Sequence, residues 1–583
     1  MKASSKLSIA VLPLVNRSSD PEDEYISDGM TEELILSLSK IPGLKVSALT
    51  SSFSFKEKAL DIRDIGAQLG VDNLLEGSIR KSGNQLRVSL QLINVEDGFC
   101  LWADRFKRDI SDIFVLQDEI SLVVADRIRE NFGHLEFSDN LVNKSTSSIS
   151  AYEHYLKGRH KMREWTAENL ETAIAHQKQA IAEDPSFAKA YFEIAWSYIM
   201  LIAWGYIDPE ETIELVHSYA RRGKSLVQES AEYYYLMATE AFWLHWDFKK
   251  SRAFLLQALA LDPDNSTMLE SMAELCLPSG HFEEGLQYIN QSLEIDPLSP
   301  NHWFTKAHLL NFKGEQEEAL KLYDYCLELN PKFSLAWGHK IQILLQLQRK
   351  AEMASCLVHC AAPEKVEELY LRMHGSPTEK EKLSLPASDA ESSLFPWNLY
   401  LWAHSDHLEE ATAYLQKMIH QKAGTCINYR FDPLLKPLRE YPSAQALFEL
   451  ESWDSIQNRK VQTHAEEKPD FQFLKQLEEL IQAEELYLNP KLSLRELAEI
   501  LNCSPNYLSW QINKGLGQNF NEYVNGFRLK RFQHIALLPE NKSLTLLALA
   551  FDSGFNTKSV FNEYFKKQTG LSPRAWLKAR QLP

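Results

Sequence analysis

The sequence predicts a mainly α-helical, multidomain protein: a small α/β domain, a solenoid of paired helices and an all-α carboxyl-terminal domain. Three observations lead to this fold class. Strand-like and helix-like segments alternate in the first part of the chain, up to about position 130. Prolines then recur at a constant step in the middle of the chain. One helix-turn-helix pattern occurs twice near the carboxyl terminus.

Length and composition place the chain among ordinary globular proteins. Its 583 residues allow three or four domains, and 44% hydrophobic against 24% charged residues is far from a disordered profile. No apolar run approaches the roughly 20 residues that a membrane helix needs, and the first residues lack a signal-peptide core. Seven cysteines without a CxxC pair indicate a reducing compartment. We therefore expect a cytoplasmic protein with no membrane partner.

The amino-terminal region, residues 1–135, is expected to fold as a small α/β domain. Its expected elements are a strand at 7–15, helices at 27–39 and 62–69, strands at 73–80, 85–94 and 99–106, and a helix at 111–129. Met30, Leu34 and Leu38 recur at helical spacing, and Gly83 lies in a tight turn between two strands. The last three strands should therefore form an antiparallel meander.

Four segments of this region resemble the TolB-like amino-terminal domain, which precedes tetratricopeptide repeats in bacterial regulators and cyclases. They are Ile9-Ala-Val-Leu-Pro-Leu, Asp28-Gly-Met-Thr-Glu-Glu-Leu, Leu75-Glu-Gly-Ser-Ile-Arg and Asp112-Ile-Phe-Val-Leu-Gln-Asp-Glu. The resemblance covers about residues 5–130 and implies an accessory or sensory role without known chemistry. Asp28, Glu32 and Glu33 could suggest catalysis or metal binding, but acidic residues commonly gather at a helix N-terminus because the helix dipole favours them there.

Residues 150–450 are expected to form an array of helix pairs. Pro263, Pro297 and Pro331 are equally spaced, and Gly280 and Gly314 repeat at the same step. Small residues, which let paired helices approach closely, stand five positions before each proline; they are Ala258, Ser292 and Cys326. A period of about 34 residues with these features resembles tetratricopeptide repeats, so a tetratricopeptide-type α-solenoid is predicted.

The array is less regular at both ends. Pro185 marks an earlier repeat, and the long interval from there to Pro263 should include one degenerate repeat, lengthened around residues 204–228. The pattern decays after Gln346, residues 375–393 look like a loop, and residues 395–450 look helical again and would cap the stack. The concave face of such a solenoid suits a protein or peptide ligand, although the array could also be a spacer.

The duplicated pattern near the carboxyl terminus is typical of DNA reading. The first copy runs over residues 494–517 and the second over 546–570. The turn residue is Asn502 in the first copy and Gly554 in the second, two residue types that accept the left-handed conformation. Because a helix fits the major groove, two such units can read two successive turns of DNA.

The second copy closely resembles the signature of the AraC-type regulators. From Ala550 to Pro573 it reads Ala-Phe-Asp-Ser-Gly-Phe-Asn-Thr-Lys-Ser-Val-Phe-Asn-Glu-Tyr-Phe-Lys-Lys-Gln-Thr-Gly-Leu-Ser-Pro. The resemblance covers about residues 490–580. It implies a linker helix between the two units, near residues 520–537, with Arg528 at the usual arginine position of the family.

The same resemblance implies which side chains contact DNA. The expected DNA-binding residues are Asn506, Ser509, Trp510, Lys514, Arg528, Lys558, Ser559, Asn562, Glu563 and Lys566. Trp510 and Glu563 depart from the basic or amide residues that the family often has, so the operator sequence does not follow. Trp510 could instead support the first unit, and Glu563 could pair with Lys566 or Lys567.

The expected DNA-binding domain, residues 471–583 after a linker at 451–470, is the basic end of an acidic chain. Residues 487–583 contain 13 Lys and Arg against 6 Asp and Glu, a net charge of +7. The whole chain carries −18, which leaves −25 for residues 1–486. Attraction for phosphate is therefore localised at the carboxyl-terminal end. The acidic remainder is equally compatible with a role in solubility alone.

The sequence contains no recognisable catalytic or cofactor motif. It lacks a phosphate-binding glycine loop, a metal-ligand box and a nucleophile motif. Cys356 and Cys360 lie one helical turn apart around His359, but buried helix cysteines explain this spacing better than a metal site. We therefore expect no enzymatic activity, no cofactor and no bound metal.

These features predict a bacterial transcription regulator that binds double-stranded promoter DNA. The AraC-type resemblance implies activation through contact with RNA polymerase. Residues 1–450 would sense a protein, peptide or small effector, or recruit a partner, on the repeat array. The alternative is a protein-interaction scaffold that its carboxyl-terminal domain anchors to DNA.

Overall fold

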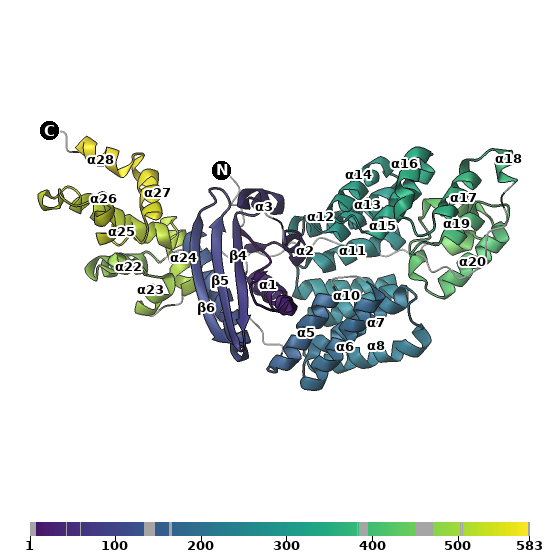
Figure 1. Cartoon of the computed structure of the whole chain (residues 1–583), viewed down its shortest axis with the longest axis horizontal. Helices are drawn as coiled ribbons and strands as arrows, with labels where there is room; N and C mark the ends of the chain where they lie inside the picture. The colour runs from purple at the N-terminus through teal and green to yellow at the C-terminus, as the bar shows by residue number, and fades with distance from the viewer. Residues whose placement is uncertain are drawn as a thin grey trace.

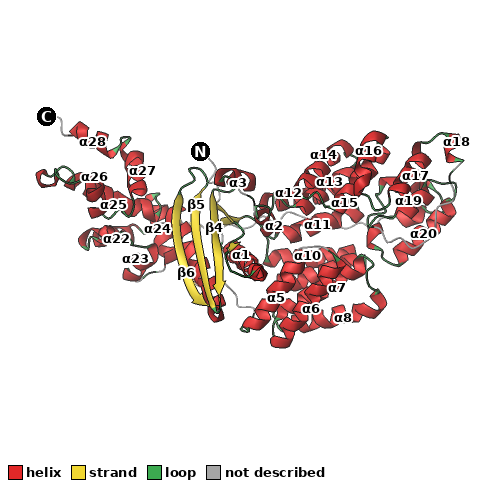
Figure 2. Ribbon diagram, in the orientation of Figure 1, coloured by secondary structure: helices red, strands yellow, loops and turns green. Residues whose placement is uncertain are grey.

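The chain folds into a small sheet, a helical solenoid and an all-α carboxyl-terminal domain, as the sequence predicts (Figure 1, Figure 2). In Figure 1 the sheet stands between the carboxyl-terminal helices and the repeat array. The computed structural model describes residues 7–580, except residues 42, 57, 59, 133–145, 163–165, 382, 384–393, 450–469, 502 and 504.

The sheet joins a parallel half to an antiparallel half. Its strands are β1 (Leu7–Val11), β2 (Val15–Asn16), β3 (Leu44–Val46), β4 (Asn73–Ser82), β5 (Gln85–Asn94) and β6 (Cys100–Asp109). The order is β3-β1-β4-β5-β6; β1 runs parallel to β3 and β4, while β4, β5 and β6 form the expected meander. The single strand expected at 7–15 is interrupted around Pro13, which has no N–H for sheet pairing, and β2 pairs separately with β4.

Four helices complete this domain. They are α1 (Glu24–Ser39), α2 (Leu49–Phe53), α3 (Ile62–Leu69) and α4 (Ile113–Phe132). The sequence predicts α1, α3 and α4, whereas β3 and α2 are too short to show a period. The core of the domain holds Leu34, Leu75 and Ile120 and continues into Tyr152 and Phe187 of the first helix pairs of the solenoid. The first repeat therefore shares a hydrophobic core with the α/β domain.

The solenoid begins with six helix pairs. They are α5 (Ile149–Met162) with α6 (Ala167–Glu183), α7 (Ala188–Ala203) with α8 (Pro209–Lys224), α9 (Ala231–Trp243) with α10 (Phe248–Leu261), α11 (Ser266–Ser279) with α12 (Phe282–Ile295), α13 (Pro300–Lys313) with α14 (Gln316–Leu329), and α15 (Ser334–Gln346) with α16 (Lys350–Cys356). The expected degenerate repeat is the pair α7 and α8. It lacks the regular proline after α8 but packs in the same way as the other pairs.

One residue in the left-handed conformation stands in the turn inside each helix pair from α7–α8 to α15–α16. Gly280 and Gly314 have φ angles of +75° and +96° at this point. Trp246 and Gln348 stand one repeat earlier and one repeat later, and their φ angles are +54° and +58°. Gly205 in the turn between α7 and α8 also has a positive φ, +73°, so a left-handed residue occurs in five consecutive pairs and is a glycine in three of them.

Shorter helices follow the six pairs. They are α17 (Pro363–His374), α18 (Pro377–Lys380), α19 (Trp397–Ala403), α20 (Leu408–His420) and α21 (Lys436–Glu440). Three of them, α19 to α21, lie in the region 395–450 where the sequence predicts helices. Helix α18 lies within the loop expected at 375–393, most of which is outside the described residues. The linker expected at 451–470 lies almost entirely outside them as well.

The carboxyl-terminal domain contains seven helices among its described residues. They are α22 (Phe471–Ala483), α23 (Leu494–Ile500), α24 (Pro505–Leu516), α25 (Phe520–Ile535), α26 (Leu546–Asp552), α27 (Lys558–Thr569) and α28 (Pro573–Arg580). Helix α25 joins two hydrophobic clusters, one around Leu497 and Leu508 and one around Phe532 and Phe561. This is the predicted pair of helix-turn-helix units on one linker helix.

Within the described residues, no helix is both long enough and apolar enough to cross a membrane.

Candidate DNA-binding site and regulatory contacts

Helix α27 presents a polar, exposed face. Thr557 caps the helix by accepting a hydrogen bond from the Val560 N–H at 3.3 Å. Phe561 and Phe565 turn inward and pack on Phe532 of α25. The exposed side chains include the five predicted from the second unit, which are Lys558, Ser559, Asn562, Glu563 and Lys566. Their spacing places all five on one side of the helix.

The base of α27 is fixed to the linker helix. Lys567 pairs with the Glu522 carboxylate at 2.8 Å, and the Tyr564 hydroxyl donates to the Glu522 backbone oxygen at 2.9 Å. Glu563 forms no ion pair among the described residues, so the alternative of a pair with Lys566 or Lys567 is wrong. The cation of Lys567 holds the two helices together, and Glu563 stays on the exposed face.

Helix α24 of the first unit is less open. Lys514 is exposed and Trp510 is half-buried, whereas Ser509 is only 5% exposed. The side chain of Asn506 lies outside the described residues, as do Asn502 and Ser504 of the preceding turn. Ser509 therefore does not reach the surface in this structure. The helical period predicts an exposed position for Ser509, but the packing around α24 buries this side chain.

Arg528 is buried and forms hydrogen bonds inside the domain, so it is not a surface cation. Its guanidinium donates to the backbone oxygens of Tyr487 and Asn489, both at 2.7 Å, and to Asn525 Oδ1 at 3.0 Å. Burial lowers the pKa of Arg528 to about 10, so the group remains charged at neutral pH. The structure thus places this predicted DNA-binding residue inside the domain, where its charge is compensated by carbonyl dipoles.

The turn of the second unit has the predicted left-handed glycine. Gly554 has a φ of +92°, and a Cβ at this position would lie 2.3 Å from the Tyr487 oxygen. The same glycine borders the Arg528 guanidinium. The turn is therefore constrained twice, by its backbone angle and by the close approach of the segment before α23.

The first helix-turn-helix unit is docked on helix α4 of the α/β domain. The Leu494 N–H donates to Glu130 Oε1 at 2.8 Å, and Arg495 Nε lies 3.0 Å from Asp126 Oδ2. Near the start of α25, Asn519 Nδ2 donates to the Asn131 backbone oxygen at 2.7 Å. We call these interactions the α4 contact. They hold the start of α23 and of α25.

Glu130 is the buried centre of the α4 contact. Its carboxylate also pairs with Arg127 at 2.6 Å, and burial raises the pKa of Glu130 above its usual range. A carboxylate at the first N–H groups of α23 is favoured by the dipole of that helix. The sequence does not reveal this contact because Glu130 and Leu494 lie in domains at opposite ends of the chain.

A second contact joins the α/β domain to the repeat array. The Ser51 N–H donates to Asp296 Oδ1 at 2.8 Å, and the Leu298 N–H donates to Ser51 Oγ at 2.8 Å. Arg159 of α5 pairs with Glu32 at 2.5 Å and with Glu193 at 2.7 Å. Burial raises the pKa of Asp296 to about 6.

The acidic residues of α1 belong to this contact as well. The buried Asp28 carboxylate lies 2.7 Å from Lys56 Nζ and 3.0 Å from His160 Nδ1. Because α1 begins at Glu24, Asp28 and Glu32 lie beyond its first turn. The explanation by a helix N-terminus is therefore wrong for these two residues. Asp28 pairs with Lys56 inside the α/β domain and contacts His160 of the array, and Glu32 pairs with Arg159 of the array.

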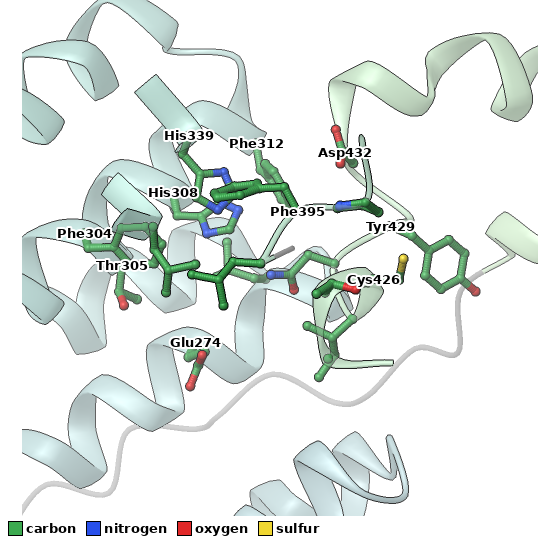
Figure 3. A pocket seen from close by; sticks show the side chains of 18 of the residues that line it. Glu274, Phe304, Thr305, His308, Phe312, His339, Phe395, Cys426, Tyr429 and Asp432 are labelled. Carbon is green, nitrogen blue, oxygen red and sulfur yellow. The ribbon is translucent and has the colours of Figure 1, made fainter. Parts of the chain in front are cut away.

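A cavity of about 110 Å³ opens inside the repeat array (Figure 3). Helices α11, α13 and α15 form one side, and residues 424–435 form the other. Its aromatic lining consists of Trp204, Trp243, Phe304, Phe312, Phe395, Tyr400 and Tyr429. This volume is somewhat below that of an engineered apolar cavity of about 150 Å³ that takes up benzene.

Polar groups converge on the same cavity. Figure 3 shows His308 and His339 side by side, and their rings are 4.3 Å apart. His308 Nε2 is buried without a hydrogen-bond partner among the described residues. Burial lowers the pKa of His339 to about 4 and raises the pKa of Glu274 and of Asp432. The cavity is therefore apolar with a few uncharged or easily neutralised polar groups, as small-molecule sites commonly are.

Three known families match parts of the chain. Residues 497–579 match a helix-turn-helix domain, residues 4–122 match the second domain of HilA/YgeH-like transcriptional regulators, and residues 303–333 match a tetratricopeptide repeat. The matches confirm the AraC-type helix-turn-helix and the tetratricopeptide resemblances. The amino-terminal match is to HilA-like regulators, and the TolB-like resemblance stays a prediction.

Curated relatives extend these matches. The putative adenylate cyclase 3 of Rhizobium meliloti is 36% identical over 191 residues, 33% of this chain and 32% of the relative. The uncharacterized HTH-type transcriptional regulator YobQ of Bacillus subtilis is 32% identical over 90 residues, 15% of this chain and 36% of the relative. The transcriptional regulator HilA of Salmonella typhimurium is 20% identical over 281 residues, 48% of this chain and 49% of the relative.

The chain thus spans between about a third and a half of the curated relatives it matches. Among solved structures, the TPR protein YrrB is 19% identical at a TM-score of 0.23, covering 34% of this chain and 93% of its own. Pseudomonas aeruginosa PilF is 17% identical at a TM-score of 0.28, covering 40% and 96%. The solenoid is therefore defined by its own helix pairs and not by these structures.

The matched domains and the fold define a class: the chain carries a helix-turn-helix domain of the DNA-binding type, tetratricopeptide repeats and a region shared with transcription regulators. Among the named relatives, HilA and YobQ are both transcriptional regulators.

Proposed function

We propose that this chain is a cytoplasmic transcription regulator that binds promoter DNA through α27 and α24 and responds to an effector in the cavity of the array. The observation that carries the proposal is the exposed polar face of α27 on a basic domain. Lys558 and Asn562, one helical turn apart, can donate to base edges in the major groove, where Lys favours guanine and Asn favours adenine.

The remaining predicted residues divide into two groups. Ser559, Lys566 and Lys514 are exposed and suit contacts with phosphate or base edges, and Trp510 offers a half-buried edge beside them. Ser509 and Arg528 are buried, and we propose that they act on DNA binding only through packing of the domain. Activation through contact with RNA polymerase is part of the proposal and rests on the AraC-type match.

A chain of contacts supports communication between cavity and DNA. The cavity belongs to the array, the array is bonded to the α/β domain at Ser51 and Asp296, and the α/β domain holds the first helix-turn-helix unit at the α4 contact. Coupling between the cavity and the DNA-binding domain requires, in addition, that some element along these contacts adopts two alternative arrangements. An effector changes promoter activity only if it binds those arrangements with different affinities.

Selection from a random DNA pool tests the DNA-binding part. Lys558→Ala should weaken specific binding by about 1–3 kcal/mol and relax preference at one base pair. Lys475→Ala, which removes another exposed Lys of the same domain, from α22, is the matched control and should leave the preference unchanged. An identical selected sequence for wild type and Lys558→Ala would assign Lys558 to the phosphate backbone instead.

Transcription from the native promoter tests the sensory part. Deletion of residues 1–450 should abolish the response to growth conditions while DNA binding persists. His308→Phe should alter the response by changing the cavity, and Glu283→Gln, at an exposed position of α12, should not. A truncated protein that regulates with unchanged amplitude and unchanged response would favour the scaffold alternative, in which the array only recruits cargo.

We also propose that the chain is not an enzyme. The relative named as a putative adenylate cyclase shares about a third of its length with this chain, and the sequence offers no phosphate-binding glycine loop. Incubation of the purified chain with ATP and a divalent cation should yield no cyclic AMP. Product formation above that of a buffer control would contradict this part of the proposal.

A further inference from the structure

Two histidines and a glutamate meet where the second and third helix pairs of the solenoid pack together. His217 lies on α8, Glu240 on α9 and His245 in the turn that follows α9. His217 Nε2 is 2.9 Å and His245 Nε2 is 3.2 Å from Glu240 Oε1. One ligand-type atom from each of the three residues lies within 4.8 Å of the other two.

The glutamate is incompletely satisfied by its neighbours. Glu240 is only 4% exposed, and its second oxygen, Oε2, is buried without a hydrogen-bond partner among the described residues. No Lys or Arg of the described chain forms an ion pair with it. A buried carboxylate oxygen without a partner is costly. Two neutral histidines that donate to Oε1 would leave Oε2 in this state, whereas a bound cation would compensate the whole carboxylate.

The donor set selects the kind of cation. Two imidazole nitrogens with one carboxylate are typical of zinc and other first-row transition metals, whereas calcium and magnesium prefer oxygen ligands. Metal–ligand distances of about 2.0–2.2 Å place tetrahedral ligand atoms roughly 3.4 Å apart, close to the separations seen here. Glu214 Oε2 lies 3.7 Å from His217 Nδ1. A metal-bound histidine commonly has a carboxylate near its second ring nitrogen, which orients the ring, and Glu214 has this position.

Access from solvent completes the arrangement. The side chains of His217 and His245 are 34% and 41% exposed, so an ion can enter and a water molecule can complete its shell. The three residues join α8 to α9, which belong to successive helix pairs. The neighbouring Trp243, also on α9, lines the cavity of the array.

We propose that His217, Glu240 and His245 bind a transition-metal ion of the Zn²⁺ type and that the ion fastens the second helix pair to the third. This inference is independent of the proposed regulatory function. It also departs from the expectation of no bound metal, because the three residues match no spacing that is recognisable in a sequence.

Metal binding by the full chain tests the proposal. The protein is stripped with a chelator, equilibrated with Zn²⁺ and separated from free ion, and bound zinc is measured by mass spectrometry. Wild type should bind one more ion than His245→Ala, whose changed residue lies in an exposed turn and should leave the fold intact by circular dichroism. Co²⁺ in place of Zn²⁺ should give the visible absorption of a tetrahedral site in wild type only.

Two further variants test the size of the effect, and a third is the control. Glu240→Gln should weaken binding about 100-fold or more, and Glu214→Gln by about 10–100-fold, the usual loss for an outer-shell partner. His359→Ala, which lies between Cys356 and Cys360 and stacks on Trp337, should bind as wild type does. Equal zinc content in wild type and His245→Ala would overturn the proposal, as would loss of the ion in His359→Ala alone.

Discussion

Replacement of Arg528 by Ala is expected to destabilise the DNA-binding domain without changing the bases it prefers. Arg528 is 6% exposed and donates to the backbone oxygens of Tyr487 and Asn489 and to Asn525 Oδ1. A Cβ on Gly554 would lie 3.1 Å from its Nε. One side chain thus connects the segment before α23, the linker helix α25 and the turn of the second unit.

The size of the effect follows from these bonds. Each hydrogen bond to a charged group contributes about 1.5–3 kcal/mol, and contributions that share one side chain are not additive. The substitution also leaves the buried Tyr487 backbone oxygen without a donor, whereas the exposed Asn489 backbone oxygen still accepts from the Leu492 N–H at 3.2 Å. The cost of burying the guanidinium, visible in its lowered pKa, offsets part of the gain. A net loss of about 2–4 kcal/mol is expected, because one buried oxygen is left unsatisfied and the hydrogen bonds to the guanidinium are lost together.

Hydrogen exchange of the full chain is the suitable assay, because several domains do not unfold in one step and a global melting curve would mix them. Peptides that cover residues 486–489 and 526–535 should exchange faster in Arg528→Ala. The matched control is Lys530→Ala, which removes an exposed positive charge that lies 5.7 Å from the Phe527 ring. That variant should change exchange little, since exposed interactions contribute at most about 1 kcal/mol.

A DNA selection experiment separates the structural role from a direct one. Arg528→Ala and Lys530→Ala should both select the wild-type sequence, with lower affinity for the first. Unchanged hydrogen exchange together with a changed base preference for Arg528→Ala would refute the structural role and make Arg528 a base-contacting residue.

Three further outcomes are expected. Fragment 471–583 should bind DNA by itself, with affinity falling on the order of 10³-fold between about 50 and 200 mM salt; no gel shift at low salt would contradict this. Arg495→Ala breaks the pair with Asp126 at 3.0 Å, so α23 should exchange faster in the full chain by the roughly 0.5–1 kcal/mol of a partly exposed pair, but not in the fragment. Asp296→Asn should remove the pH dependence of stability that the Asp296 carboxyl group causes. The folded pKa of Asp296 is about 6 against an ordinary 3.8, so the folded state binds the proton more tightly and wild-type stability falls as pH rises from about 4 to 6, by about 3 kcal/mol. The hydrogen-exchange rate of the Ser51 N–H should therefore rise more steeply with pH in wild type than in Asp296→Asn. The same dependence of the rate on pH in both proteins would contradict a raised pKa of Asp296.

The local elements were predictable because they rest on short-range periodicity. Met30, Leu34 and Leu38 mark α1, and the repeated spacing of Pro263 and Pro297 marks the solenoid. Where the local signal is weak, prediction failed for a physical reason. Strand β3 is too short to show a period. At Trp246 and Gln348 the left-handed turn between paired helices is formed without glycine, so the sequence does not indicate it.

The candidate site was predictable only on its outer face. Lys558, Ser559 and Asn562 are exposed as expected, because Phe561 and Phe565 fix the orientation of α27. Arg528 and Ser509 have polar side chains that the sequence assigns to the surface, yet each is buried. A helical period indicates which side chains share a face, but the neighbours that cover the face come from other segments.

The sequence by itself determined the domain order, the repeat, the duplicated helix-turn-helix and the basic end, since these depend on residues within one or two turns or one repeat of each other. Tertiary structure alone decided the α4 contact, the pairing of Ser51 with Asp296, the cavity around His308 and the cluster of His217, Glu240 and His245. Each of these joins residues that no local period relates, because chain folding brings together side chains whose spacing in the sequence carries no information about their distance in space.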